Sequence, residues 1–214
     1  MTIAKAGFGG GCHWCTEGVF QSLRGVSQVD QGFVQSDAPA DTWAEGVVVT
    51  FDPKVIQLET LSEVHLRTHS ATRERSPRGK YRSAIYLFDD HQRLEAERAI
   101  ASFADQSGKP VHTLVIPFRS FKASDERFQN YYRTDPSRPF CRLYIDPKLD
   151  LIRQHFSDLA LPGATAPQVI EGGDRVVTDS NDIALPIGPI PPVAIRERHP
   201  CPIGPGNTTP SGAR

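Results

Sequence analysis

Residues 9–17 of the chain read Gly-Gly-Gly-Cys-His-Trp-Cys-Thr-Glu, a glycine-rich turn that leads into two closely spaced cysteines. We expect a helix to begin here, with Cys12 at its N-terminus. The unpaired N–H groups at a helix N-terminus carry partial positive charge, which favours thiolate over thiol. His13 would act in the same direction when protonated, and Cys15 follows one helical turn later. The segment therefore predicts an activated sulfur nucleophile with a second thiol within reach.

Other interpretations stay open on these residues alone. Unpaired cysteines are often buried and inert, and a CxxC pair can be half of a zinc site. The four cysteines are unevenly spaced, which fits thiol chemistry better than a disulfide framework. His65 and His69 have the i, i+4 spacing of a ligand pair on a helix, but no further ligands fall into place beside them. We therefore expect no metal site.

Length and charge limit the classes of function. The chain has 214 residues and a formal net charge of −1, so bulk charge gives no reason to expect a nucleic acid or an anionic membrane as partner. No apolar run is long enough to span a bilayer, and the N-terminus lacks the apolar core of a secretory signal. We expect a cytoplasmic, monomeric protein.

The composition changes near residue 161. Ten of the eighteen prolines lie beyond it, among glycine and small polar residues. Such a segment can bury little apolar surface to offset its ordering entropy. We predict a domain over residues 1–162 and an extended or disordered tail over residues 163–214. Cys201 lies in this tail and is expected to be a bystander.

The first part of the chain alternates between the two kinds of hydrophobic pattern. Strand patterns occur at residues 3–9, 46–51, 84–88 and 113–116. Helical spacing occurs at residues 13–23, 58–65, 91–106 and 149–159. This order predicts an α+β fold, a two-layer sandwich of helices on a mixed or antiparallel sheet.

Residues 11–17 resemble the GCFWGxE signature of the methionine sulfoxide reductase type A family. Further matches follow in the same order: residues 23–26 with LPGV, 44–53 with HAE…YDP, His69 with the histidine of HDP, 80–85 with QYRSAI, 125–131 loosely with AExYHQxY, and 140–149 with YC…PKL. The resemblance covers about residues 5–160 and implies the ferredoxin-like fold of that family.

The resemblance implies reduction of the S-epimer of methionine sulfoxide, free or in proteins, to methionine. Cys12 corresponds to the nucleophile that attacks the sulfoxide sulfur. Glu45 corresponds to the acid that protonates the sulfoxide oxygen, and Tyr81 to a tyrosine whose hydroxyl bonds near that oxygen. Trp14 matches one wall of an apolar pocket for the substrate methyl group, with His13 beside it.

The attack would leave Cys12 as a sulfenic acid, with which a second thiol must condense. Cys141 corresponds to the resolving cysteine of many family members, and Cys15 is a rival because it is near in sequence. The resemblance implies that an external dithiol such as thioredoxin reduces the final disulfide. It implies no cofactor.

The chain departs from the family pattern at several positions, so we expect a divergent member. His13 replaces a phenylalanine and Cys15 a glycine. The loop between Phe33 and Ala44 is shorter and lacks a tyrosine that usually assists Tyr81. Ser76, which we place among the substrate-binding residues, stands where an aspartate of the NDxG motif is expected. A weakened supporting shell usually lowers the rate or alters substrate choice rather than the reaction type.

Two alternative functions remain open. The chain could be a general thiol–disulfide oxidoreductase that uses Cys12 and Cys15, although Gly11 stands where thioredoxin-like proteins carry tryptophan. It could also be a catalytically weak paralogue that binds a sulfoxide without turnover. Activity toward sulfoxide epimers and toward a disulfide separates these readings.

Overall fold

Six strands form one mixed sheet in the order β5-β4-β1-β3-β2-β6. The computed structural model describes residues 3–162, so the expected tail and Cys201 lie outside the described residues. Strands β4 and β5 pair in parallel, and every other neighbouring pair is antiparallel. The strands are β1 (Ala4–Gly9), β2 (Val26–Gln35), β3 (Ala44–Phe51), β4 (Ala84–Leu87), β5 (Leu114–Pro117) and β6 (Ser120–Ala123).

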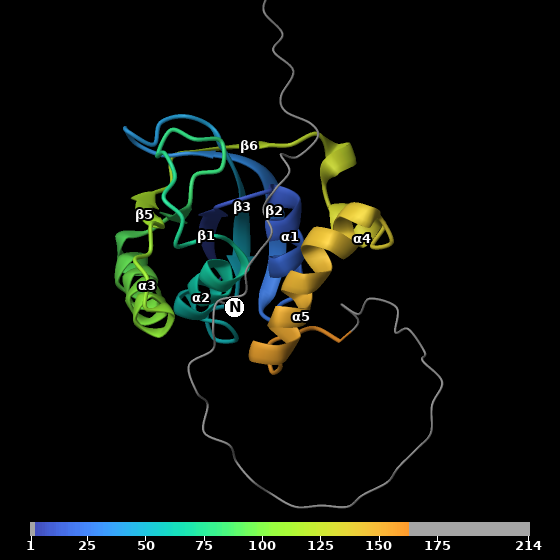
Figure 1. The fold of residues 1–214 in the computed structure, drawn as a ribbon. Coiled ribbons are helices and arrows are strands. Elements are labelled where there is room, and N and C mark those ends of the chain that lie inside the picture. The colour runs from blue at the N-terminus through green and yellow to red at the C-terminus, as the bar shows by residue number, and fades with distance from the viewer. Residues whose placement is uncertain (1–2, 163–214) are drawn as a thin grey trace, which may run out of the picture.

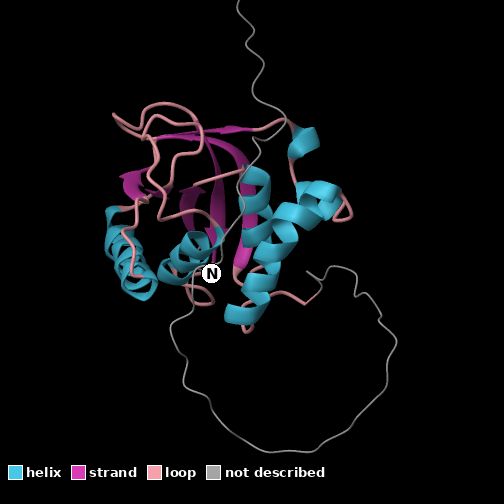
Figure 2. Ribbon diagram, in the orientation of Figure 1, coloured by secondary structure: helices cyan, strands magenta, loops and turns pink. Residues whose placement is uncertain are grey.

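The longer helices gather on one side of this sheet, where α1, α2 and α5 contact one another (Figures 1 and 2). They are α1 (His13–Gln21), α2 (Leu58–Thr68), α3 (Arg93–Ser107) and α5 (Asp146–His155). The shorter elements are η1 (Asp90–Gln92), η2 (Glu126–Phe128), α4 (Tyr131–Thr134) and the π-helical turn η3 (Cys141–Ile145). The α+β class with a mixed sheet, predicted from the alternating patterns, is confirmed.

Alternation along β3 fixes which of its side chains face the helices. Val47, Val49 and Phe51 point into the main core, where each fully buried side chain of this size contributes about 1.5–3 kcal/mol. The helices supply Phe20, Leu61 and Val64 to the same core. Glu45 lies two residues before Val47 and shares its face of the strand. The strand period therefore directs a carboxyl group toward the helix layer.

Two strands were not expected from the sequence. In β2 the period-2 pattern is broken by the buried, polar Gln31 and by a register shift between Val26 and Gln28. Strand β6 contains a single large apolar residue, Phe121, and therefore shows no strand pattern. Helix α5 also begins before the expected position, at Asp146, because Pro147 is well tolerated in a first helical turn.

Two buried histidines support the glycine turn that precedes Cys12. The Nε2 atom of His65 lies 2.9 Å from the Gly9 carbonyl oxygen, and that of His69 lies 2.7 Å from Ser83 Oγ. A Cβ atom at Gly10 would lie 2.4 Å from the His69 ring, so only glycine fits there. Within the described residues, no group of three or more His, Cys, Asp or Glu side chains is placed to hold a metal ion.

Burial of these two histidines makes the free energy of unfolding depend on pH. Desolvation lowers the pKa of His69 to about 3, and desolvation followed by the charge of His69 lowers that of His65 well below 6.5. Between pH 6.5 and 3 the unfolded chain binds a proton at His69 that the folded chain excludes. The free energy of unfolding should therefore fall as the pH decreases, by about 2 kcal/mol from His69 between pH 7 and pH 5.

Urea unfolding at pH 7 and pH 5 measures this difference. His69→Gln should reduce the loss of stability on acidification, whereas the same change at the exposed His91 should leave it as it is. Equal pH dependence in both variants would contradict the assignment.

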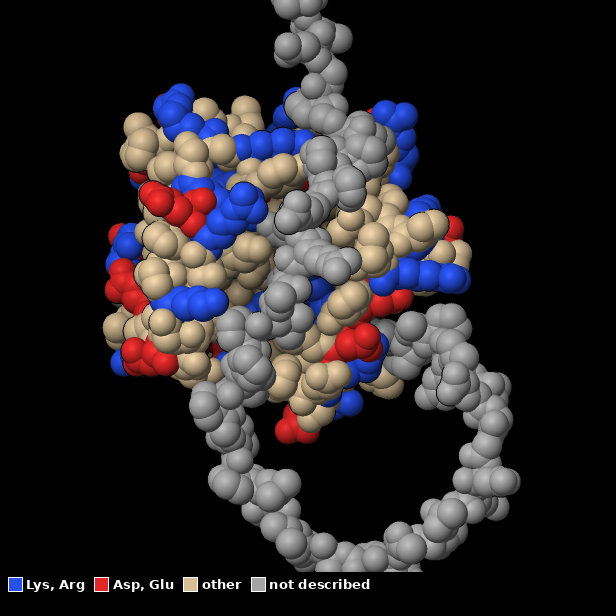
Figure 3. Space-filling model, viewed as in Figure 1, with Lys and Arg blue, Asp and Glu red and all other residues tan. Residues whose placement is uncertain are grey.

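Acidic and basic side chains are interspersed over the face shown in Figure 3. Among the helices that the structure describes, none has both the length and the apolar character needed to cross a membrane.

Candidate active site

Cys12 is the N-cap residue of α1, as the glycine turn predicts. Its backbone is extended, with φ −64° and ψ 124°, and its carbonyl oxygen accepts the amides of Cys15 and Thr16 at 3.1 and 3.2 Å. The Cys12 side chain is partly exposed. A thiol in this position feels the partial positive charge of the helix N-terminus, which favours the reactive thiolate.

Glu45 meets the same helix end from strand β3. Its side chain is 1% exposed, and Oε2 accepts the backbone N–H of His13 at 3.2 Å. Its other oxygen, Oε1, forms an ion pair with Lys80 Nζ at 2.9 Å. The backbone N–H of Glu45 also donates to the Lys80 carbonyl at 2.7 Å. The structure thus places the predicted acid against the peptide group that directly follows Cys12.

His13 is buried and uncharged at neutral pH. Desolvation lowers its pKa, against the opposing effects of the Glu45 charge and the Gly32 hydrogen bond. Its Nδ1 atom lies 2.9 Å from the Gly32 carbonyl, which can only accept, so Nδ1 carries the proton. The help that a protonated His13 would give to Cys12 therefore does not apply at pH 7.

Trp14 lies in an aromatic cluster beside Cys12. Its ring stacks on Tyr131 at a centroid distance of 4.2 Å, and Phe128 and Phe140 lie 5.8 and 5.6 Å away. The edge of Phe33 meets His13 at 5.5 Å. These rings supply an apolar environment next to the sulfur. The methyl-binding role expected for Trp14 stays a prediction.

Glu17 fastens the aromatic cluster to α1. Its buried carboxylate accepts the backbone N–H groups of Asn130 at 2.7 Å and Tyr131 at 3.0 Å. Desolvation raises the Glu17 pKa, and these two hydrogen bonds oppose the shift. The contact holds the start of α4 in place and so determines where the Tyr131 ring lies.

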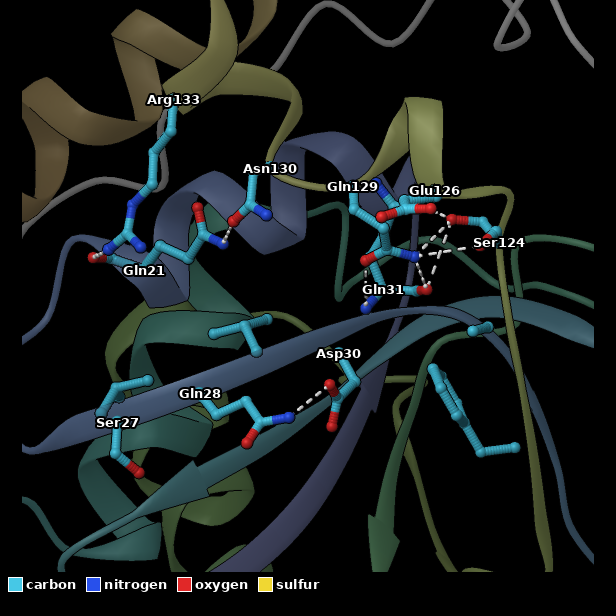
Figure 4. A pocket seen from close by; sticks show the side chains of 14 residues that line it. Gln21, Ser27, Gln28, Asp30, Gln31, Ser124, Glu126, Gln129, Asn130 and Arg133 are labelled. Carbon is cyan, nitrogen blue, oxygen red and sulfur yellow. Dashed lines mark hydrogen bonds between the residues drawn. The ribbon is translucent and has the colours of Figure 1, made fainter.

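A polar cavity of about 580 Å³ lies behind this cluster, between β2 and the segment that leads into α4 (Figure 4). On its wall, Gln31 Nε2 donates to the Phe128 carbonyl at 2.8 Å, and Gln129 Nε2 donates to the Gln31 carbonyl at 2.8 Å. Ser124 joins the same network through Gln129. These bonds tie Phe128, and with it one side of the aromatic cluster, to the sheet.

Tyr81 is joined to Glu45 through Lys80, whose Nζ lies 5.1 Å from the centroid of the Tyr81 ring. Ser76 lies on an exposed turn before this segment, where its Oγ accepts the Arg78 amide at 3.2 Å. The structure therefore brings Tyr81 to the site, whereas Ser76 shapes the turn that leads to it. The substrate contact expected of Ser76 stays a prediction.

The buried Arg82 holds the loop between β2 and β3 against the loop that contains Ser76. Its guanidinium donates to the Thr42 carbonyl at 2.6 Å, to the Pro77 carbonyl and to the Tyr86 hydroxyl at 3.1 Å. These partners come from both loops and from β4, so Arg82 fixes the backbone next to Lys80.

The structure also brings three cysteines together. Cys15 and Cys141 are buried in one apolar cluster, and Cys12 packs against it. Burial raises the pKa of the Cys141 thiol to about 11; Arg138 opposes the shift, and the negative charge of Asp146 adds to it. Both candidate resolving thiols therefore lie in the apolar cluster against which Cys12 packs. The raised pKa means that the Cys141 thiol is protonated at neutral pH.

Comparison with known proteins agrees with this arrangement. The family model described as peptide methionine sulfoxide reductase matches residues 4–160. The chain belongs to this family. It is 34% identical over 170 residues to the peptide methionine sulfoxide reductase MsrA of Deinococcus radiodurans, covering 72% of this chain and 82% of that protein. It is also 34% identical over 169 residues to the MsrA of Sulfolobus acidocaldarius, covering 72% and 96%.

Solved structures show the same fold. Mxr1 from Saccharomyces cerevisiae in its reduced form superposes with a TM-score of 0.56 at 22% identity, covering 65% of this chain and 89% of that one. Mxr1 in an unusual oxidized form gives a TM-score of 0.53 at 23% identity, covering 63% and 83%. The peptide methionine sulfoxide reductase fold therefore extends over the described sheet and helices.

Sequence reasoning missed several side chains that shape this site. The family resemblance gives Lys80 no role of its own, although Lys80 stands where the family motif QYRSAI has glutamine. Glu17, Gln31 and Arg82 act through contacts with residues far away in the chain, which local patterns do not reveal. A charged residue replacing a neutral one beside Tyr81 was the available signal for Lys80.

Proposed function

We propose that this chain reduces the S-epimer of methionine sulfoxide to methionine, with Cys12 as nucleophile. The observation that carries the proposal is the position of Cys12 at the N-cap of α1, next to the Glu45 carboxylate. Membership of the peptide methionine sulfoxide reductase family supports the reaction type.

In the first step the Cys12 thiolate attacks the sulfoxide sulfur. The sulfur–oxygen bond of the substrate breaks, the oxygen passes to Cys12 as a sulfenic acid, and methionine leaves. The oxygen gains negative charge during this transfer and must take up a proton. Glu45 corresponds to the acid of the family pattern, so we assign proton delivery to Glu45, whose carboxyl group contacts the His13 amide and Lys80. Tyr81 lies nearby.

The substrate methyl group would lie against the aromatic cluster of Trp14. Burying one methyl group there contributes about 0.8 kcal/mol. His13 is neutral, and its ring packs against Phe33, so it can line this apolar side without bringing a charge.

In the second step Cys141 attacks the sulfur of the Cys12 sulfenic acid, which releases water and forms a disulfide. The shared cluster of the two cysteines supports this pairing, and Cys15 in the same cluster is the alternative partner. An external dithiol such as thioredoxin would then reduce the disulfide and restore both thiols.

Incubation with each methionine sulfoxide epimer and dithiothreitol tests the reaction. We expect methionine from the S-epimer and none from the R-epimer. Insulin reduction without sulfoxide reduction would favour a general thiol–disulfide oxidoreductase, and sulfoxide binding without turnover would favour a weak paralogue. Either result would overturn the proposed function.

A further inference from the structure

Gln31 is a polar side chain that is fully buried within strand β2. Its Nε2 group donates to the Phe128 carbonyl at 2.8 Å and to Glu17 Oε2 at 3.4 Å, and its Oε1 atom accepts the Ser124 hydroxyl. One amide group therefore joins β2 to helix α1 and to the segment between β6 and α4. Both polar atoms of this amide have partners, as is usual for a buried polar group.

Packing contributes little to the position of that segment. The pairing of β6 with β2 ends at Gly32, and beyond it the polar cavity of about 580 Å³ lies between β2 and the residues that lead into α4 (Figure 4). None of the residues of η2, the turn that carries Phe128, is buried. The Gln31 and Gln129 amides each donate to a backbone carbonyl across this space, at 2.8 Å. Hydrogen bonds therefore hold η2 to the sheet on this side.

The segment held in this way supplies two of the rings around Trp14. Phe128 lies 5.8 Å from the Trp14 ring, and Tyr131 stacks on it at 4.2 Å. The Gln31 amide influences both rings. It bonds directly to the Phe128 carbonyl, and it also bonds to Glu17, which accepts the Tyr131 N–H at 3.0 Å. Removal of the amide would free both contacts at once.

We propose that Gln31 is a positioning residue for substrate binding. Its amide sets where the Phe128 and Tyr131 rings lie beside Trp14, and so determines how tightly the site holds the methyl group of methionine sulfoxide. The reacting thiol of Cys12 is held separately, at the N-cap of α1, so the chemical step does not depend on this amide. This role rests on the proposed function and deepens it.

The first-turnover rate, measured over a range of methionine-S-sulfoxide concentrations, separates substrate binding from the chemical step. Gln31→Leu keeps a side chain of similar size but removes the amide. We expect the half-saturating sulfoxide concentration to rise about fourfold or more, the change that loss of one methyl contact would produce, while the maximal rate stays within about threefold. The matched control is Gln28→Leu on the same strand, whose exposed amide donates to Asp30 Oδ1 at 2.7 Å. It should leave both values unchanged.

Poorer folding alone would give a different result. A smaller folded fraction lowers the amount of methionine formed in the first turnover, but it does not change the half-saturating concentration of the molecules that are folded. If the wild type forms methionine and Gln31→Leu has a half-saturating concentration within twofold of it, the role of Gln31 is wrong and the proposed function stands. If the wild type forms none, both proposals fall.

A second measurement does not depend on the folding of a Gln31 variant. In the Cys12→Ser protein, which cannot turn over, NMR of isotope-labelled glutamine side chains reports on each amide group. Saturating methionine-S-sulfoxide should shift the Gln31 side-chain signals, because the rings that this amide positions contact the substrate, and it should leave the Gln28 signals in place. Unchanged Gln31 signals, when a shift of the Trp14 indole signal shows that the sulfoxide is bound, would overturn the positioning role.

Discussion

Cys12→Ser should abolish methionine sulfoxide reduction, with a loss on the order of 10³-fold or more. A serine hydroxyl is not ionised at neutral pH, even at a helix N-terminus, and it cannot carry the oxygen as a sulfenic acid does. The assay is methionine formation from the S-epimer in the presence of dithiothreitol.

This loss should occur without loss of the fold. Serine is among the preferred N-cap residues, so the free energy of unfolding should be unchanged or higher than that of the wild type. Urea unfolding of Cys12→Ser provides the control. Residual activity within tenfold of the wild type, in a folded variant, would show that another group receives the oxygen.

Cys141→Ser should separate the first turnover from the steady state. The variant keeps Cys12 and Glu45, so it should form one equivalent of methionine per chain at close to the wild-type rate. With thioredoxin as the only reductant, steady-state turnover should then fall about 100-fold, because the Cys12 sulfenic acid has lost its partner thiol.

Cys15→Ser is the matched control, because Cys15 belongs to the same buried cluster and the chemical change is identical. We expect it to keep most of the steady-state rate. If Cys15→Ser instead stops turnover and Cys141→Ser does not, Cys15 is the resolving thiol.

Local patterns were sufficient for the parts of the site that depend on neighbouring residues. The glycine turn followed by helical spacing placed Cys12 at the start of α1, and this signal arises from backbone geometry over a few residues, which the sequence displays directly. Glu45 precedes the strand predicted over residues 46–51, so its role came from the family resemblance and its buried position from the structure.

Contacts between distant segments could not be derived in this way. Gln31 is a buried polar residue because it bonds to the Phe128 carbonyl, 97 positions later, and without that partner it looks like a break in a strand. Lys80 meets Glu45 only because the loop after α2 returns to β3. Likewise, Cys141 reaches the cluster of Cys15 because the turn η3 packs against α1.

The most direct test of the central claim follows the oxygen atom. A Cys15→Ser/Cys141→Ser variant, which cannot form a disulfide with Cys12 from either candidate, is given one equivalent of methionine-S-sulfoxide labelled with heavy oxygen and trapped with a reagent that retains that oxygen. We predict that the label appears on the Cys12 peptide, in an amount equal to the methionine formed. Methionine formation with no label on Cys12 would contradict the account.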